Sequence, residues 1–365
     1  MSAERSFPPL APFDRWLNQP DVIGIMVDGY DKVYVEREGG FEDVPSPFRD
    51  NEHLMAVINE VAAAYGRTVD QCNPLFDARL FDGGRINAVA PPISVAGPAL
   101  VIRKLRTAPL TAEDLIRFGS WNEDMITLLR ACVHARLNMV VAGGTASGKT
   151  TVQNLIASMI PQNERVIVIQ HASELVLSHK YLVTLETRPP NLEGQGAVNM
   201  KDLVENALRM RPDRIIVSEL LGGMAGSDQA FLDLISAMNR GHDGTLLNVH
   251  ASSLHDVLTR MEMMATSANP SLPLLNVRQQ IAASVDVITY QERLRDGTRK
   301  VTKVAEVVGT QGDAIALQDI FEFRQTGMEG DKIAGHFTPT GYIPRFLDRV
   351  QAAGIDLSLD FFKPR

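Results

Sequence analysis

Eight consecutive residues carry the strongest chemical signal in this chain. Residues 143–150 read Gly-Gly-Thr-Ala-Ser-Gly-Lys-Thr and fit the pattern G-x-x-x-x-G-K-[ST]. Backbone N–H groups in such a turn can point inward as a nest for anions, and the N-terminus of the next helix adds partial positive charge. Lys149 is then expected to reach the β- and γ-phosphates of a nucleotide, and the Thr150 hydroxyl to ligate Mg²⁺.

The residues around this motif support a phosphate loop over a chance glycine-rich turn. Residues 138–142 are typical of a short buried strand, and residues 151–160 have apolar side chains at helical spacing and stop before Pro161. The motif therefore lies between a strand and a helix, where phosphate binding needs it, and the predicted cofactors are ATP and Mg²⁺. The predicted binding residues are Gly143, Gly144, Thr145, Ala146, Ser147, Gly148, Lys149, Thr150 and Thr151.

Hydrolysis also needs a carboxylate at the end of a strand beside the loop. Glu219 follows the apolar residues 215–217 in the pattern of a Walker B strand and is the predicted catalytic and metal-binding residue. Glu174 follows another apolar stretch, residues 166–169. It could act on the metal or on water, and a solvated helix-capping role is the alternative.

Two histidines and several arginines complete the candidates. His242 and His250 flank a predicted strand at residues 245–249, where a neutral imidazole could sense or polarise a γ-phosphate, although a structural role is an alternative. Their spacing of eight, with no cysteine nearby, disfavours zinc. Arginine side chains suit phosphate oxygens, but composition does not select one as an arginine finger. The arginines considered are Arg188, Arg209, Arg211 and Arg214.

Bulk properties limit the class of protein. A chain of 365 residues predicts two domains. Its net charge of −8 disfavours non-specific electrostatic binding to nucleic acid. Two cysteines cannot build a disulfide framework or a four-cysteine zinc module, which indicates a reduced cytoplasmic compartment. Without a run of eighteen apolar residues, we expect any contact with the membrane to be peripheral or through partners.

The pattern along the chain predicts two kinds of domain. Residues 1–106 form an irregular lead-in of about 20 residues and a small α+β domain, with a helix near residues 52–65. Residues 107–118 are the predicted linker, and Thr111 has the pattern of a helix N-terminus. Residues 119–365 alternate strands and helices, which predicts an α/β sheet of largely parallel strands. Short strands are expected over residues 285–323, with a turn at residues 295–297.

Longer sequence stretches then point to a family. The chain resembles the CpaF/TadA family of secretion ATPases, the traffic ATPases of tight-adherence pili, from about residue 14 to its end. The matching stretches include Asp-Ala-Arg-Leu-Phe-Asp-Gly-Gly-Arg at residues 77–85 and Thr-Arg-Pro-Pro-Asn-Leu-Glu-Gly at residues 187–194. The others are residues 25–29, 91–92, 102–104, 206–214, 317–321 and 339–341.

The resemblance implies a PAS-like N-terminal domain followed by a RecA-like ATPase domain. It also implies a homo-hexameric ring at the cytoplasmic face of the inner membrane, attached through a platform protein of a pilus or secretion system. In such rings, arginines of the N-terminal domain reach the nucleotide, and the matching positions here are Arg85 and Arg103.

This chain departs from the family pattern near the phosphates. Gln170 and His171 stand where relatives carry Glu-Asp, Leu221 replaces an arginine, and Ala146 replaces a loop glycine. These departures favour one alternative to an active secretion motor, a nucleotide-binding regulatory or assembly subunit with impaired hydrolysis. The resemblance to related conjugation ATPases suggests another alternative, a motor that translocates nucleic acid, which the negative net charge disfavours.

Overall fold

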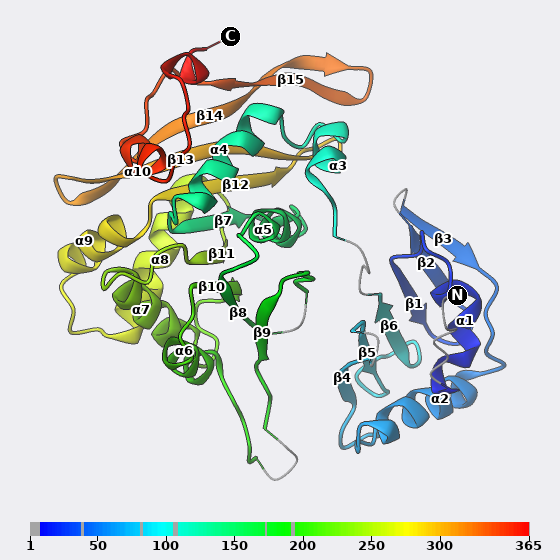
Figure 1. The fold of residues 1–365 in the computed structure, drawn as a ribbon. Helices are drawn as coiled ribbons and strands as arrows, with labels where there is room; N and C mark the ends of the chain where they lie inside the picture. The colour runs from blue at the N-terminus through cyan, green and yellow to red at the C-terminus, as the bar shows by residue number, and fades with distance from the viewer. Residues whose placement is uncertain are drawn as a thin grey trace. The chain divides into compact units, whose positions relative to one another are not determined.

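The computed structural model describes residues 8–37, 40–80, 83–104, 109–171, 174–190 and 194–364. The chain divides into two compact units, Met1–Thr107 and Ala108–Arg365. Figure 1 draws the first in blue to cyan and the second in turquoise through green and yellow to red. The predicted lead-in residues 1–7 and linker residues 107–108 lie outside the described residues. The predicted domain boundaries stay predictions, and each unit is described by itself.

The first unit is an antiparallel sheet of six strands in the order β3-β2-β1-β6-β5-β4. Its core forms where alternate strand residues such as Ile25 and Val27 pack with Leu54 and Ile58 of helix α2. The Asp50 side chain caps α2 by accepting the N–H of His53. The elements are β1 (Gly24–Asp28), β2 (Val33–Arg37), β3 (Gly40–Val44), α2 (Asn51–Ala64), β4 (Leu75–Arg79), β5 (Arg85–Val89) and β6 (Ala99–Arg103).

The expected irregular lead-in is wrong for residues 8–17. These residues form a 3₁₀-helix, η1 (Pro8–Phe13), followed by a short helix, α1 (Asp14–Leu17). Phe13 and Trp16 lie in the core of the first unit. The prolines suggested irregular chain, but a fixed φ near −65° is compatible with a helical first turn, and burial of the two aromatic rings orders the segment.

The second unit contains a nine-stranded sheet in the order β15-β14-β13-β12-β7-β11-β10-β8-β9. The strands from β12 to β9 in this order are parallel, as predicted, and β13, β14 and β15 continue the sheet with antiparallel pairing. The strands are β7 (Met139–Gly143), β8 (Arg165–Gln170), β9 (Tyr181–Glu186), β10 (Arg214–Leu220), β11 (Leu246–His250), β12 (Val287–Arg293), β13 (Arg299–Gln311), β14 (Ala314–Glu329) and β15 (Lys332–Pro339).

Helices cover both faces of this sheet (Figure 1). Along β7, Met139 and Val141 belong to one apolar cluster and Val140 and Ala142 to the other, because successive side chains point to opposite faces. The first cluster includes α4, α5 and α10, and the second includes α6, α7, α8 and α9. The helices are α3 (Ala112–Arg117), α4 (Glu123–His134), α5 (Lys149–Ser158), α6 (Met200–Arg209), α7 (Ser227–Met238), α8 (Leu254–Ala268), α9 (Leu274–Ser284), α10 (Leu347–Ala352) and the 3₁₀-helix η2 (Leu359–Phe362).

The expected short strands at residues 285–323 are wrong in length. β13 has 13 residues and β14 has 16, and β15, which the sequence did not indicate, pairs with β14. Irregular pairing near Gly309 and Gly327, together with exposed side chains at the outer end of β14, interrupts the alternation that marks a strand in sequence. Within the described ranges, no helix is both long enough and apolar enough to cross a membrane.

Candidate nucleotide-binding site

The predicted phosphate loop connects β7 to α5 at the carboxyl edge of the parallel strands. Gly143 is paired in register with His250 of β11 on one side and with Gln291 of β12 on the other. A Cβ atom on Gly143 would overlap the backbone oxygen of Gln291 and lie 2.7 Å from Ser147 Oγ. Glycine is therefore required by close backbone approach at the point where the strand enters the loop.

Lys149 is buried beneath the loop. Its Nζ donates to the carbonyl oxygen of Gly144 at 2.8 Å and lies 3.5 Å from Nδ1 of His250. Nε2 of the same imidazole lies 3.3 Å from the Thr145 hydroxyl. Burial lowers the pKa of Lys149, and the charges of Glu219 and Glu174 oppose this shift. The loop, its lysine and His250 therefore form one connected site.

His250 favours the neutral imidazole. Burial lowers its pKa, and the positive charge of Lys149 lowers it further, while Glu219 acts in the opposite direction. A neutral ring carries one N–H donor and one acceptor nitrogen. It can therefore accept a hydrogen bond from one loop group while donating at its other nitrogen.

Glu174 approaches the first turn of α5. Its Oε2 accepts the Thr150 hydroxyl at 3.2 Å. The buried Gln170 holds this segment, because its side-chain oxygen accepts the N–H groups of Glu174 at 3.2 Å and Leu175 at 3.3 Å. Gln170 thus anchors the carboxylate-bearing loop through a neutral acceptor. The structure thus brings two separately predicted site residues, Thr150 and Glu174, into contact.

Glu219 lies near the carboxyl end of β10, where the pairing with β11 is irregular between Val217 and Leu220. The side-chain nitrogen of the fully buried Gln153 donates to the Val217 carbonyl at 2.7 Å, which ties α5 to this end of the strand. The negative charge of Glu219 opposes the lowering of the pKa values of both Lys149 and His250. Glu219 therefore belongs to the same electrostatic environment as the loop.

His171 also faces this environment. Burial lowers its pKa, against the influence of Glu219. Its Nδ1 lies 3.4 Å from the Thr187 hydroxyl, whereas its buried Nε2 has no hydrogen-bond partner among the described residues. The second departure from the family pattern thus places a neutral ring where a carboxylate was expected.

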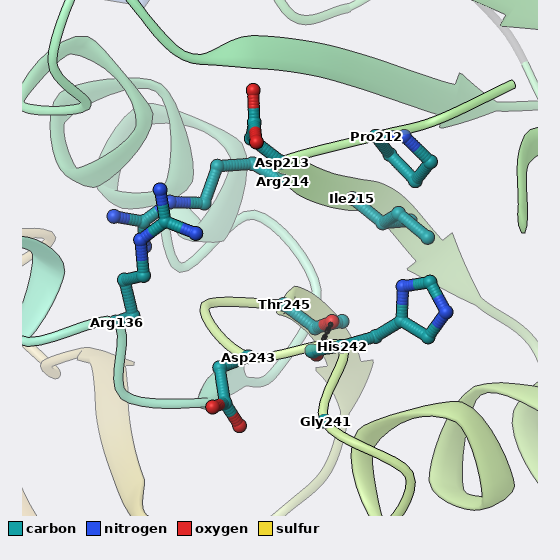
Figure 2. Close-up of a pocket in the computed structure, with 9 residues that line it drawn as sticks. All are labelled: Arg136, Pro212, Asp213, Arg214, Ile215, Gly241, His242, Asp243 and Thr245. Atoms are coloured by element: carbon teal, nitrogen blue, oxygen red, sulfur yellow. Dashed lines mark hydrogen bonds between the residues drawn. The ribbon is translucent and has the colours of Figure 1, made fainter.

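The structure does not bring His242 to the phosphate loop, which corrects the prediction that both imidazoles act there. His242 precedes β11, whereas His250 ends it, so the two rings lie toward opposite edges of the parallel sheet. Figure 2 shows His242 among the residues that line a pocket on that side of the sheet, together with Arg136 and Arg214. In the sequence the two histidines lie on either side of the predicted strand, but only the carboxyl end of a parallel strand faces the loop.

The candidate arginines have different surroundings. Arg85 and Arg103 lie directly opposite each other on β5 and β6 of the first unit, and Arg85 pairs with Asp77 at 3.3 Å. Their role at a nucleotide stays a prediction. Arg214 is buried against Glu164, and Arg188 donates to the carbonyl of Gly196 at 2.7 Å.

Sequence reasoning missed a hairpin beside the loop. Gln291 of β12 packs against the loop backbone, and Nε of Arg299 on β13 donates to the Ala146 carbonyl at 2.9 Å. The available signal was the predicted turn at residues 295–297, which the hydrogen bond from Gly297 N to Leu294 O confirms. Nothing in the spacing, however, showed that this hairpin adjoins a loop about 150 residues earlier.

A parallel α/β sheet with a phosphate loop at its carboxyl edge defines a protein of the P-loop class. The family model described as "Type II/IV secretion system protein" matches residues 9–330, and the chain belongs to this family. The resemblance inferred from the sequence is thereby confirmed at the level of this family.

Relatives cover most of the chain. A putative conjugal transfer protein of Mycobacterium tuberculosis strain H37Rv is 33% identical over 326 residues, which cover 88% of this chain and 90% of the relative. The probable conjugal transfer protein TrbB of Sinorhizobium fredii is 30% identical over 295 residues, covering 80% and 85%. A type IV secretion system protein, VirB11 of Bartonella quintana, is 27% identical over 333 residues, covering 81% and 91%.

Solved structures show the same fold. The X-ray structure of the Legionella pneumophila ATPase DotB aligns with a TM-score of 0.56 and 18% identity, covering 84% of this chain and 83% of that chain. The pilus retraction motor PilT with bound ADP aligns with a TM-score of 0.52 and 16% identity, covering 76% of each chain. The predicted fold, an N-terminal α+β domain and a RecA-like domain, is confirmed.

Proposed function

We propose that this protein is an ATPase of a secretion or pilus-assembly machine, which binds Mg-ATP at residues 143–150 and couples its hydrolysis to motion of its domains. The observation that carries the proposal is the connected site in which Lys149, His250 and the Thr150–Glu174 pair surround one loop. The names of similar proteins, a VirB11 protein of type IV secretion and the motor PilT with ADP, support this direction.

The oxygen-bearing side chains fit a magnesium ion. Mg²⁺ prefers hard oxygen ligands and usually takes one or two carboxylates together with substrate phosphates and water. Thr150 offers a hydroxyl, Glu174 a carboxylate 3.2 Å from it, and Glu219 a second carboxylate in the same environment. These residues would hold the ion, which supplies charge neutralisation on the phosphates when it is bound.

The remaining residues divide the work of binding and positioning. Lys149 donates to a loop carbonyl and is placed to exchange this contact for a phosphate oxygen. Neutral His250 contacts both Lys149 and Thr145 and would orient them toward the terminal phosphate. Glu219, near the end of its strand, is the residue we assign to orient the attacking water.

We further propose that the protein acts as a homo-hexamer at the cytoplasmic face of the inner membrane, held there by a platform protein of the machine. Arg85 and Arg103 then contribute to nucleotide binding in the ring. Size-resolved assays of the full chain test this assembly, because a hexameric fraction should carry the ATPase activity. Activity confined to a monomeric fraction would contradict it.

Phosphate release from ATP with and without Mg²⁺ tests the activity. Wild-type protein should release phosphate only with Mg²⁺, and Lys149→Ala should lose at least about 100-fold of this rate, because it removes a charge that stabilises the transition state. Lys201→Ala is the matched control, since Lys201 lies on α6 and pairs with Glu205 at 3.6 Å. A folded Lys149→Ala protein with wild-type turnover would contradict the assignment.

One observation supports a second candidate function. Gln170 and His171 place neutral groups near the loop where carboxylates were expected, which would weaken hold on Mg²⁺. A nucleotide-binding regulatory or assembly subunit would therefore bind ATP and release negligible phosphate. Equal phosphate release by wild type and Glu219→Gln would favour this second candidate, and robust wild-type turnover would exclude it.

A further inference from the structure

The β12–β13 hairpin forms one wall of the phosphate loop. β12 runs parallel to β7 and brings Gln291 opposite Gly143, and β13 returns with Arg299 opposite Arg293. The hairpin residues Gln291, Arg293 and Arg299 belong neither to the loop motif nor to the acidic and histidine candidates. The hairpin therefore contacts the loop from a part of the chain to which no role at the nucleotide has been assigned.

Gln291 packs tightly against the loop backbone. Its side chain is buried, and its Nε2 lies 2.9 Å from the position that a Cβ atom on Gly148 would occupy. Oε1 of Gln291 and the hydroxyl of Ser147 are both buried without a hydrogen-bond partner in the described part of the chain. Buried polar atoms without partners are uncommon, and each calls for an explanation such as a catalytic role or a bound ion. This side of the loop is thus closely packed but incompletely bonded.

Arg299 contacts the loop at Ala146, whose backbone conformation is unfavourable for a residue with a side chain. Ala146 has a φ of 57°, in the left-handed region that side chains with a Cβ rarely adopt. The Nε of Arg299 donates to the carbonyl of this same residue at 2.9 Å. Hydrogen bonds from charged donors are roughly twice as strong as neutral ones. The bond from the hairpin is therefore suited to keep Ala146 in the conformation that the loop requires.

We propose that Arg299 is a positioning residue for nucleotide binding. Through the Ala146 carbonyl it fixes the left-handed turn, so that the backbone N–H groups of the loop face the phosphates. This inference rests on the proposed function of the loop. The hairpin holds the loop in the conformation that binds nucleotide, and the loop itself binds the phosphates.

Direct binding of ADP and of a non-hydrolysable ATP analogue to the full-length protein tests the proposal by calorimetry. Arg299→Ala should raise the dissociation constants of both nucleotides about 10-fold, because the loop must then be ordered at the expense of binding. The turnover rate at saturating ATP should stay within about 2-fold of wild type, because the bound loop is the same. A much larger loss for the ATP analogue than for ADP would overturn a pure positioning role, since it would indicate direct contact with the γ-phosphate.

Two further variants separate the hydrogen bond from charge. Arg299→Lys keeps the charge but lacks the Nε–H group and its planar geometry, so it should bind nearly as weakly as Arg299→Ala. Full recovery in Arg299→Lys would overturn the proposal. Arg295→Ala, which removes the same charge from the turn of the same hairpin, should bind both nucleotides as wild type does.

A double-mutant cycle with Ala146→Gly tests the physical cause. Glycine adopts positive φ at no steric cost, so Arg299→Ala in the Ala146→Gly background should raise the dissociation constants by less than about 3-fold. Equal losses in both backgrounds would overturn the mechanism. If wild type binds neither nucleotide, the proposed function of the loop fails. If wild type binds but Arg299→Ala binds equally well, only the role of Arg299 fails.

Discussion

The two edges of the second unit's parallel sheet differ in whether their buried polar groups have hydrogen-bond partners. At the amino edge, the fully buried side chain of Asn138 donates to the Ser284 carbonyl at 2.8 Å and accepts the Thr245 N–H at 3.0 Å. Its backbone N–H donates to Asp286 at 2.7 Å, and Asp286 also pairs with Arg349 at 2.6 Å. One hydrogen-bonded network thus joins the starts of β7, β11 and β12.

A buried ion pair extends this network. The guanidinium of Arg214 pairs with Glu164 and donates to the Val133 carbonyl at 2.7 Å. Arg136 pairs with the same carboxylate at 3.1 Å. The guanidinium groups of Arg136 and Arg214 lie together in Figure 2, and His242 is turned away from them. This edge is built from groups that bond to one another.

The carboxyl edge leaves buried atoms without partners. Within the described residues, they include Ser147 Oγ, His171 Nε2 and Gln291 Oε1. An unmade bond at a buried polar atom costs about 1–3 kcal/mol. In the part of the chain that the structure describes, none of the unpartnered buried side-chain atoms belongs to the amino-edge network. Unpartnered atoms beside the phosphate loop are expected of a site shaped for a ligand. The comparison indicates that one edge stabilises the sheet and the other is adapted to binding.

The largest stability loss should follow from breaking the amino-edge ion pair. Among the described residues, Arg214→Ala leaves the buried carboxylate of Glu164 with Arg136 as its remaining charged partner. We expect the free energy of unfolding to fall by about 3–5 kcal/mol. Urea unfolding of the full chain measures this change, with Arg260→Ala as the control, because Arg260 is half exposed beside Asp256. Equal stability of the two variants would show that the amino edge is not the stabilising one.

A smaller loss of stability is expected for a substitution of Asn138, at the centre of the same network. Asn138→Ala removes two side-chain hydrogen bonds and leaves the Ser284 carbonyl and the Thr245 N–H without them. We expect a destabilisation of about 2 kcal/mol in urea unfolding. A change below about 0.5 kcal/mol would contradict the role given to this residue.

At the carboxyl edge, removal of a buried polar group should not lower the stability of the protein. Ser147→Ala removes a buried hydroxyl that has no partner in the described residues. Without nucleotide, the variant should therefore be equal to wild type or more stable, by up to about 1 kcal/mol. Thermal unfolding without added nucleotide measures this, and a loss comparable to that of Asn138→Ala would remove the contrast between the edges.

The sequence predicted the parts of the site that are contiguous. The loop at residues 143–150 could be recognised because its chemistry is contained in eight adjacent residues between a strand and a helix. Gln291 and Arg299 could not, since only the register of β12 beside β7 brings them to the loop. His242 was misplaced because spacing does not say which end of a strand faces the ligand. The alternation of apolar strands with helices predicted the parallel strands, whereas bulges and exposed residues concealed the length of β13 and β14.

The smallest effect expected is a difference in pH response. His250 has a pKa below its ordinary value of 6.5, so the unfolded chain binds the proton more readily than the folded chain, and its contribution to stability is lost as pH falls below about 6.5. Burial raises the pKa of Asp286 above its ordinary value of 3.8, so the folded chain binds this proton more readily than the unfolded chain. At Asp286, lowering the pH toward 3.8 therefore favours the folded chain. The free energy of unfolding should fall less between pH 7 and pH 5 in His250→Gln than in wild type. An identical pH response would refute this assignment.

The most direct test of the whole account measures ATP turnover and stability on the same preparations. Wild type, Lys149→Ala and Arg214→Ala are compared for Mg²⁺-dependent phosphate release and for urea unfolding without nucleotide. We predict that Lys149→Ala loses turnover with unchanged stability, and that Arg214→Ala loses stability but retains turnover at temperatures where it is folded. Stable wild-type protein without turnover, or a Lys149→Ala variant with full turnover, would contradict the account.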